Sequence, residues 1–223
     1  MESLRSSLVA QVMPLLLKGA VTTVTISVCA MSLALVLGLV AAIGRMSRRR
    51  SLRFISGFYV EVIRGTPLLV QLFIVYYGLP SYGIRLEPFM AGFLTLGIHY
   101  GAYLSEVYRA GILSVDRGQW EAAASIGMTR SSVLRVIILP QAIRVILPPI
   151  GNYFISMLKD SALTATITVS ELLRAGQLRV AITFRAMDIY LMVAAIYLTL
   201  SYPLSILIRW LEKRSSRGFD AHE

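Results

Sequence analysis

The chain has 223 residues, of which 56% are hydrophobic and only 15% are charged, and its mean hydropathy is +0.69. This composition excludes an ordinary soluble domain, in which about 25% of residues are charged, and predicts an all-α, polytopic membrane protein. The formal net charge of +10 comes from basic residues in loops beside apolar runs, so we attribute it to anionic membrane lipid and expect no nucleic-acid partner.

Five apolar runs each approach the roughly 20 residues that a helix needs to cross a bilayer. In chain order they are Gly19–Gly44, Gly65–Ile84 (entered through Phe54–Ile63), Pro88–Ser105, Val136–Leu158 and Ile189–Ile208. A further apolar segment, Ser161–Ser170, is about half the length needed, and we interpret it as a re-entrant or interfacial helix.

Cys29 is the only cysteine, so neither an intramolecular disulfide nor a metal cluster is expected. We expect a single transmembrane domain, 1–223, with its core at about 15–212.

The basic residues predict the orientation, because loops rich in arginine and lysine stay on the cytoplasmic side of the membrane. The densest basic stretch is Arg45–Arg53, which places the N-terminus outside and the C-terminus in the cytoplasm. The segment Lys159–Asp188 carries four basic residues on the expected outer side. We therefore expect part of that segment to fold back against the helical bundle.

The four residues from Arg64 to Pro67 predict a break in the second span. Gly65 loosens the helix, Thr66 can cap the segment that follows, and Pro67 suits its first helical position. The N–H groups at such a break can bind a substrate carboxylate. The alternative is that Glu61 and Arg64 form an ion pair near the inner headgroups and that Pro67 only kinks the helix. We favour the ion pair for Arg64 and proximity to substrate for Thr66.

Several residues of the third span have a structural and a functional interpretation. We interpret His99 as a hydrogen-bonded packing residue rather than a ligand or a proton relay. Gly97 and Gly101 permit close helix contact, either within the chain or at a dimer seam. Glu106 and Arg109 are expected to pair where the span leaves the membrane.

A short helix is predicted on the cytoplasmic side at Gln119–Gly127, because alanine and glutamate favour helix and Gly127 supplies a helix end at low steric cost. Met128–Arg135 would separate it from the fourth span. The alanine face would let another protein approach closely, with Trp120 and Ile126 as apolar anchors. The alternative, which periodicity leaves open, is an amphipathic helix that lies on lipid.

In the fourth span, Asn152, Ser156, Lys159 and Asp160 follow helical spacing and would share one face. Such a face suits an amino acid zwitterion, with Asp160 for the ammonium group and Ser156 or Asn152 for hydrogen bonds. The alternative is that Lys159 and Asp160 stand at the outer interface and pair with loop residues.

The pattern Glu121-Ala122-Ala123, followed at fixed spacing by Gly127, Ile137 and Leu139-Pro140, resembles the EAA loop of permease subunits of bacterial ABC importers. From about Leu15 to Glu212 the chain resembles the polar amino acid branch of that family, and most of all its cystine- and histidine-type permeases. The further motifs are Arg64-Gly65-Thr66-Pro67-Leu68, Gln71-Leu72-Phe73, Tyr77-Gly78-Leu79-Pro80, Trp120-Glu121-Ala122-Ala123, Leu139-Pro140-Gln141-Ala142 and Lys159-Asp160-Ser161.

This resemblance implies a type I ABC importer permease fold with five transmembrane helices and a short cytoplasmic coupling helix, paired with a second permease copy. The coupling loop, 117–140, would sit in a groove of one of two ATP-binding subunits. The coupling residues implied are Trp120, Glu121, Ala122, Ala123, Gly127, Leu139 and Pro140.

The resemblance also implies an external solute-binding protein, an amino acid substrate and a place in the bacterial cytoplasmic membrane. We place the substrate pathway at Thr66, Gln71, Asn152, Ser156, Lys159, Asp160 and Ser161, and the resemblance favours Asp160 and Ser161 as residues near the central pathway. The sequence contains no G-x-x-x-x-G-K-[ST] phosphate loop, so ATP and Mg²⁺ are expected on the partner ATPase, with no cofactor on this chain and no enzymatic activity of its own.

Two other functions are alternatives to a permease subunit. A secondary transporter can also have discontinuous helices and charges at membrane depth, but it would ordinarily show more spans and repeated halves. A membrane enzyme is disfavoured because no nucleophile–base pair or metal-ligand cluster stands out in the sequence. Neither function accounts for the pattern from Glu121 to Pro140.

Overall fold

The computed structural model describes residues 2–216, and side chains are described for residues 9–213. Within that range the regular structure is helical, without a strand, as predicted. The α-helices are α1 (Glu2–Met46), α2 (Arg50–Arg64), α3 (Leu68–Phe73), α4 (Pro88–Leu113), α5 (Arg117–Ser125), α6 (Arg130–Val133), α7 (Leu139–Asp160), α8 (Leu172–Thr183) and α9 (Ala186–Ser216). Two π-helical turns, Ile74–Gly78 and Leu134–Ile138, and two 3-10 helices, Leu79–Tyr82 and Ser161–Ile167, join them.

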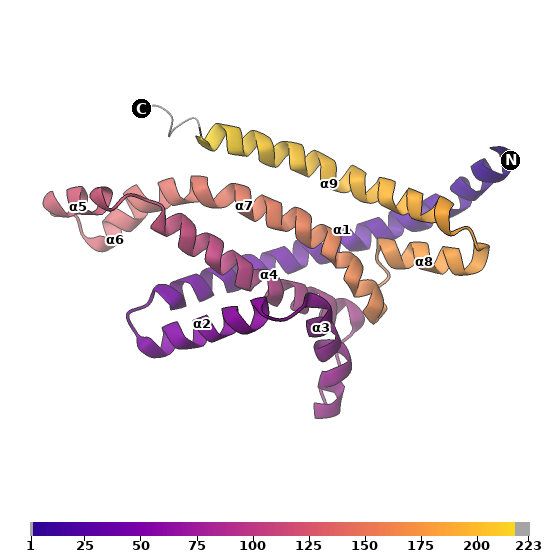
Figure 1. Ribbon diagram of the computed structural model, residues 1–223, viewed down its shortest axis with the longest axis horizontal. Coiled ribbons are helices and arrows are strands. Elements are labelled where there is room, and N and C mark those ends of the chain that lie inside the picture. Colours follow the sequence, from indigo (N-terminus) through magenta and orange to yellow (C-terminus); the bar gives the residue numbers. More distant parts are fainter. Residues whose placement is uncertain (1, 217–223) are drawn as a thin grey trace.

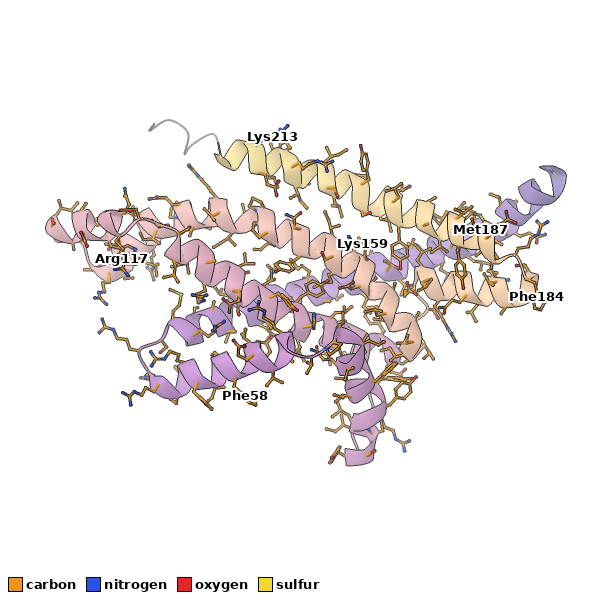
Figure 2. The ribbon with its side chains drawn as sticks, viewed as in Figure 1. Phe58, Arg117, Lys159, Phe184, Met187 and Lys213 are labelled. Carbon is orange, nitrogen blue, oxygen red and sulfur yellow. The ribbon has the colours of Figure 1, made fainter. Side chains whose placement is uncertain are left out.

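The long helices lie roughly along one axis, and α4 is the central one (Figure 1). Helix α1 packs along α4, α7 packs on α4 and α9, and α8 packs against α1 and α9. Helices α5 and α6 lie at one end of the bundle, beside the turn between α1 and α2. The opposite end holds α8 and the start of α9, so Arg117 of α5 and Phe184 lie at opposite ends of the molecule (Figure 2).

In the part of the chain that the structure describes, three helical stretches are long and apolar enough to cross a membrane: Val9–Met46, Arg130–Ile167 and Ala186–Lys213. A fourth crossing is possible if Arg50–Arg64 and Leu68–Tyr82, bent by 104° at a short break, make one span. Helix α4 has 26 residues, about 39 Å of helix, which is long enough to cross. Polar residues lower the hydropathy of α4. The prediction that α4 crosses the membrane is therefore supported only by its length and its central position.

Small residues allow α1 and α4 to approach closely. A Cβ on Gly97 would lie 2.6 Å from Leu33 Cδ2, and one on Gly101 would lie 3.0 Å from Leu37 Cβ. Both glycines of the G-x-x-x-G pair therefore face α1 of the same chain. Of the two interpretations left open by the sequence, the structure supports packing within the chain.

Ser161–Ser170 does not form an interfacial helix. Residues Ser161–Ile167 form a 3-10 helix whose Ser161, Thr164 and Ile167 are fully buried, and it packs against α4, α7 and α8. The chain then leaves through Thr168, at φ 68°. The expected folding back against the bundle is confirmed, and the interfacial interpretation is wrong because these side chains are enclosed by protein.

Helix α8 was not predicted. Glu171 is its N-cap and accepts hydrogen bonds from the N–H groups of Leu173 (2.8 Å) and Arg174 (2.6 Å). The fully buried Glu171 also accepts a hydrogen bond from the Tyr197 hydroxyl at 2.8 Å. This one carboxylate therefore fixes α8 to α9, since a buried acceptor without partners would be costly. Burial raises the pKa of Glu171 above its usual range, although these hydrogen bonds act in the opposite direction.

Candidate functional site

Helix α5 lies in the loop that was predicted to couple the chain to an ATPase. Asp116 caps its N-terminus by accepting from the Gly118 N–H at 2.6 Å. Its C-terminus ends at Gly127, which has a left-handed φ of 79° and donates its N–H to the Ala124 carbonyl at 3.0 Å. Only glycine adopts this conformation without strain. The predicted short helix and its end at a glycine are confirmed.

The alanines of this helix face in different directions. Ala123 is only 3% exposed and packs in an apolar cluster with Val133, Ile138 and Ala142 of its own chain, and Trp120 is partly buried against the same cluster. Ala122 is exposed, and Ile126 is 78% exposed. The prediction that Ala122 and Ala123 share a partner-facing surface is therefore wrong for Ala123. From Glu121 to Gly127 every residue except Ala123 is exposed.

The segment after α5 differs from its prediction. The fourth span does not begin at Val136, because an apolar helical stretch extends without interruption from Arg130. Leu134–Ile138 is a π-helical turn, directly before Leu139 and Pro140. Proline has no N–H to donate to the carbonyl four residues earlier, and the wider π-turn accommodates that missing bond. Pro140 is exposed and Leu139 is half-buried. Both lie at the end of the coupling loop, where α7 begins.

The predicted break after α2 is present, but its local geometry differs from the prediction. Pro67 is the N-cap of α3 and not its first helical residue, and no side chain caps α3. Thr66 instead donates its hydroxyl to the Val62 carbonyl at 2.9 Å. Thr66 therefore stabilises the C-terminal end of α2 and does not cap α3.

Gln71 of α3 stabilises this break through hydrogen bonds to residues on the α2 side. Its Nε2 donates to the carbonyls of Ile63 (2.8 Å) and Thr66 (3.1 Å), while its Oε1 lies 3.1 Å from His99 Nδ1. Both Gln71 and His99 are 8% exposed. His99 is thus a hydrogen-bonded packing residue, as predicted, and it connects the break to α4.

An aromatic cluster formed by His99, Tyr100, Tyr103 and Tyr153 lies where α4 meets α7. The His99 ring lies 5.5 Å from that of Tyr100 and 5.1 Å from that of Tyr103, and Tyr153 lies 5.7 Å from Tyr103. The Tyr100 hydroxyl donates to Asp160 Oδ2 at 2.7 Å. The Arg64 guanidinium lies over the Tyr103 ring, 5.3 Å from its centroid. Two opposite charges thus border one aromatic cluster.

The ion pair predicted for Arg64 has a different partner. Arg64 lies 3.5 Å from Glu106, and among the described side chains no ion pair joins it to Glu61. The predicted pair of Glu106 and Arg109 is present at 2.9 Å, and Arg45 of α1 also binds Glu106. One half-buried carboxylate therefore joins the C-terminal ends of α1 and α2 to the C-terminal part of α4.

The four polar residues of α7 do not act as one face. Asn152 donates to Glu212 of α9 at 3.2 Å, whereas Asp160 is bound by Tyr100 of α4. Lys159 is exposed and Ser156 is partly exposed. Ser161 is fully buried and donates to the Leu158 carbonyl at 2.8 Å, so its hydroxyl lines no open space in this conformation.

The structure thus brings together three of the predicted pathway residues, Thr66, Gln71 and Asp160, through His99 and Tyr100. Sequence reasoning missed the tyrosines of the cluster. Their signal is the presence of His99, Tyr100 and Tyr103 within one turn of a membrane-spanning helix, where polar aromatic side chains need partners.

Comparison with known proteins identifies the family. Residues 34–217 match the family described as "Binding-protein-dependent transport system inner membrane component". The chain is 42% identical over 208 residues to the L-cystine transport system permease protein TcyB of Bacillus subtilis, covering 92% of this chain and 88% of that protein. It is 40% identical over 203 residues to the glutamine transport system permease protein GlnP of Escherichia coli, covering 90% and 93% of the two chains.

Solved structures agree with this assignment. A chain of "an amino acid ABC transporter with histidines" superposes with a TM-score of 0.88 at 40% identity, covering 92% of this chain and 96% of that one. A chain of the inward-facing MetNI methionine ABC transporter superposes with a TM-score of 0.75 at 17% identity, covering 92% and 98%, which supports the type I importer fold alone. The chain therefore belongs to the family of inner-membrane permease components of binding-protein-dependent ABC transport systems.

Proposed function

We propose that this permease imports a polar amino acid, with ATP hydrolysed by a separate subunit. The observation that carries the proposal is about 40% identity, over nine-tenths of the chain, to permeases named for cystine and glutamine. The superposition on a chain of an amino acid ABC transporter supports the same substrate class. Transport is the function of the family, and amino acids are the common chemistry of these relatives.

The proposed assembly contains two permease copies, two ATP-binding subunits and an external solute-binding protein. The absence of a phosphate-loop motif from the sequence supports an ATPase on another chain, where ATP and Mg²⁺ would bind. The exposed Glu121, Ala122 and Ile126 offer that ATPase a small, partly apolar surface. We place no cofactor on the permease itself.

The proposed substrate site is the aromatic cluster with Asp160 and Arg64 at its borders. A zwitterion needs a negative and a positive partner, and aromatic rings add a cation–π contribution to binding of the ammonium group. Asp160 is assigned to the ammonium group and Arg64 to the carboxylate. Thr66 and Gln71 hold the break that positions Arg64, while Asn152, Ser156, Lys159 and Ser161 stay as more distant pathway residues.

Coupling follows from the connection between α5 and α7. When two ATP-binding subunits close, they would move α5, and the apolar cluster that contains Ala123 and Ile138 would carry that displacement to α7. Because Asp160 and Tyr153 are part of α7, the displacement would reach the substrate site directly.

The proposed location is the bacterial cytoplasmic membrane, with the N-terminus outside and the C-terminus inside. Arg48 and Arg49 are exposed in the turn between α1 and α2 and Arg50 is exposed at the start of α2, at the same end of the bundle as α5 (Figure 1). A cytoplasmic location of that end satisfies both the preference of basic loops for the cytoplasm and access to an ATPase.

The test is uptake of a panel of labelled amino acids by liposomes that contain the permease and its ATPase, with the binding protein outside and ATP enclosed. We expect uptake of at least one polar amino acid that requires both ATP and the binding protein. Uptake that follows an ion gradient without the ATPase would instead establish a secondary transporter.

A further inference from the structure

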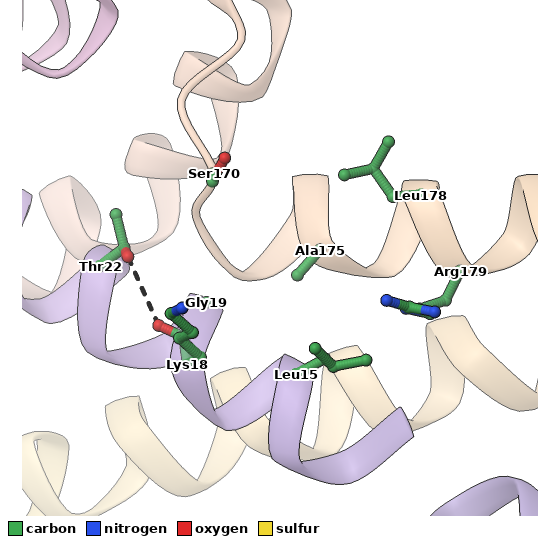
Figure 3. Close-up of a pocket in the computed structure, with 8 residues that line it drawn as sticks. All are labelled: Leu15, Lys18, Gly19, Thr22, Ser170, Ala175, Leu178 and Arg179. Carbon is green, nitrogen blue, oxygen red and sulfur yellow. Dashed lines mark hydrogen bonds between the residues drawn. The ribbon is translucent and has the colours of Figure 1, made fainter. Parts of the chain in front are cut away.

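A pocket of about 240 Å³ lies between α1 and α8, at the end of the bundle opposite the coupling loop. Its lining residues are Leu15, Lys18, Gly19, Thr22, Ser170, Ala175, Leu178 and Arg179 (Figure 3). Gly19 brings the helices together, since a Cβ there would lie 2.9 Å from Leu172 Cα and 3.0 Å from Ala175 Cβ. The pocket therefore lies beside a tight contact between α1 and α8.

The charge of this pocket is positive. Lys18 and Arg179 line it, and no acidic residue does; among the described side chains, neither cation forms an ion pair. Figure 3 shows the Arg179 guanidinium in the gap between α8 and α1. Thr22 and Ser170 also line the pocket, and the Thr22 hydroxyl donates to the Lys18 carbonyl at 3.4 Å (Figure 3). Two cations in a pocket without an acidic residue are suited to a phosphate or another oxyanion.

The surroundings of the pocket are apolar. Leu17 and Val21 of α1 and Leu178 and Ile182 of α8 are all exposed. Lys18 directly precedes the uncharged run Gly19–Gly44, which makes about 39 Å of helix and is long enough to cover the hydrocarbon core. Lys18 therefore lies at headgroup depth, with apolar side chains on the surface around it. An anionic group that reaches this position must carry an apolar portion.

We propose that this pocket binds the phosphate of an anionic phospholipid, with acyl chains along the exposed leucine, valine and isoleucine side chains. Basic pockets between membrane helices bind such headgroups. An acidic loop of the solute-binding protein is a poorer match, because a soluble partner gains little from an apolar rim at membrane depth. The lipid would join α1 to α8 at the end of the molecule remote from the coupling loop. The proposal depends neither on the substrate nor on which way the chain faces.

The test titrates the purified permease complex in detergent with short-chain phosphatidylglycerol and measures the shift of its thermal unfolding midpoint. The Lys18→Gln/Arg179→Gln double variant should bind this lipid about thirty-fold more weakly, from the effect of two basic residues near a charged membrane surface. Lys18→Gln alone should weaken binding about fivefold and also serves if the double variant folds poorly. The matched control for Lys18→Gln is Arg85→Gln, which removes one exposed basic residue outside both the pocket and the basic stretch Arg45–Arg53, and which should bind as the unmodified protein does.

Three results would overturn the proposal. Equal binding of phosphatidylglycerol by the double variant and the unmodified protein would show that the pocket is not the site. Equal shifts with phosphatidylcholine, or with inorganic phosphate alone, would show that anionic lipid is not the ligand. Loss of binding-protein-stimulated ATP hydrolysis by the double variant in phosphatidylcholine nanodiscs, where no anionic lipid is present, would identify a docking surface for the binding protein.

Discussion

At the scale of single residues, Ala122 and Ala123 are adjacent in sequence but differ in what they contact. Ala123 is enclosed by the apolar cluster of its own chain, whereas Ala122 is exposed on α5. A motif that resembles a family pattern thus contains a residue that stabilises the loop and a neighbour that is free to contact a partner. Substitution of one cannot stand for substitution of the other.

Enlargement of the two alanines should separate these roles. Ala123→Leu overfills the cluster and should destabilise the permease by about 1–3 kcal/mol, measured as a lower thermal unfolding midpoint in detergent. Ala122→Leu should leave that midpoint unchanged and reduce copurification of the ATPase, because bulk is added only at the proposed interface. Equal loss of thermal stability in both variants would contradict the assigned orientation of α5.

Asp160 offers a second test at this scale. Asp160→Asn keeps an oxygen that can accept the Tyr100 hydroxyl bond but removes the charge proposed to bind the substrate ammonium group. Uptake should fall about tenfold or more, since hydrogen bonds to charged groups contribute about 1.5–3 kcal/mol, while the amount of assembled complex stays the same. Glu87→Gln, at an exposed carboxylate before α4, is the matched control. Unchanged uptake of every labelled amino acid would remove Asp160 from the site.

At the scale of elements, the sequence predicted the features that depend on the backbone conformation of a few neighbouring residues. The end of α5 at Gly127 follows from a left-handed conformation that favours glycine, and the break after Arg64 follows from Gly65 and Pro67. Helix α8 was missed because its N-cap, Glu171, is stabilised by Tyr197 of α9, which is a contact between distant parts of the chain. The candidate site was predicted in part for the same reason: Asp160 was recognisable in sequence, but its partner Tyr100 was not.

One local structure, a π-helical turn before a Leu-Pro pair, occurs twice in this fold. A π-helical turn directly precedes Leu79-Pro80 and another directly precedes Leu139-Pro140. In each case the proline removes one helical hydrogen bond and the wider turn accommodates the gap. Only the second turn lies within the coupling loop, between α5 and the helix that carries Asp160.

This recurrence provides a matched pair of variants. Pro140→Ala restores an N–H and should convert the π-turn to regular α-helix, which rotates α5 and α6 relative to α7. We expect lower transport per ATP hydrolysed, with an unchanged or higher thermal unfolding midpoint. Pro80→Ala makes the same chemical change away from the coupling loop and should keep transport coupled. Equal transport per ATP hydrolysed in the two variants would show that the turn before Pro140 does not transmit movement from α5 to α7.

At the scale of the whole molecule, the two ends of the bundle have different proposed tasks. One end carries α5 and the exposed arginines, and the other carries α8 and the basic pocket. This division predicts that a cysteine at Ser47 reacts only with membrane-permeant reagents in intact cells, while one at Ser81 reacts with impermeant reagents, in a Cys29→Ala background. Labelling of position 47 by an impermeant reagent would reverse the proposed orientation.

The central claim is that a separate ATPase acts on the exposed end of α5. Gly127 and Gly83 allow a direct measurement, because both have a left-handed φ, 79° and 82°, and a Cβ on either would meet nothing within 4 Å. Leucine therefore imposes the same backbone strain at both positions, but only position 127 lies in the coupling loop. The measurement is the ratio of ATPase to permease after affinity purification from membranes that contain equal amounts of permease. The account predicts that Gly127→Leu loses most of the ATPase while Gly83→Leu keeps it, and full retention by Gly127→Leu would contradict it.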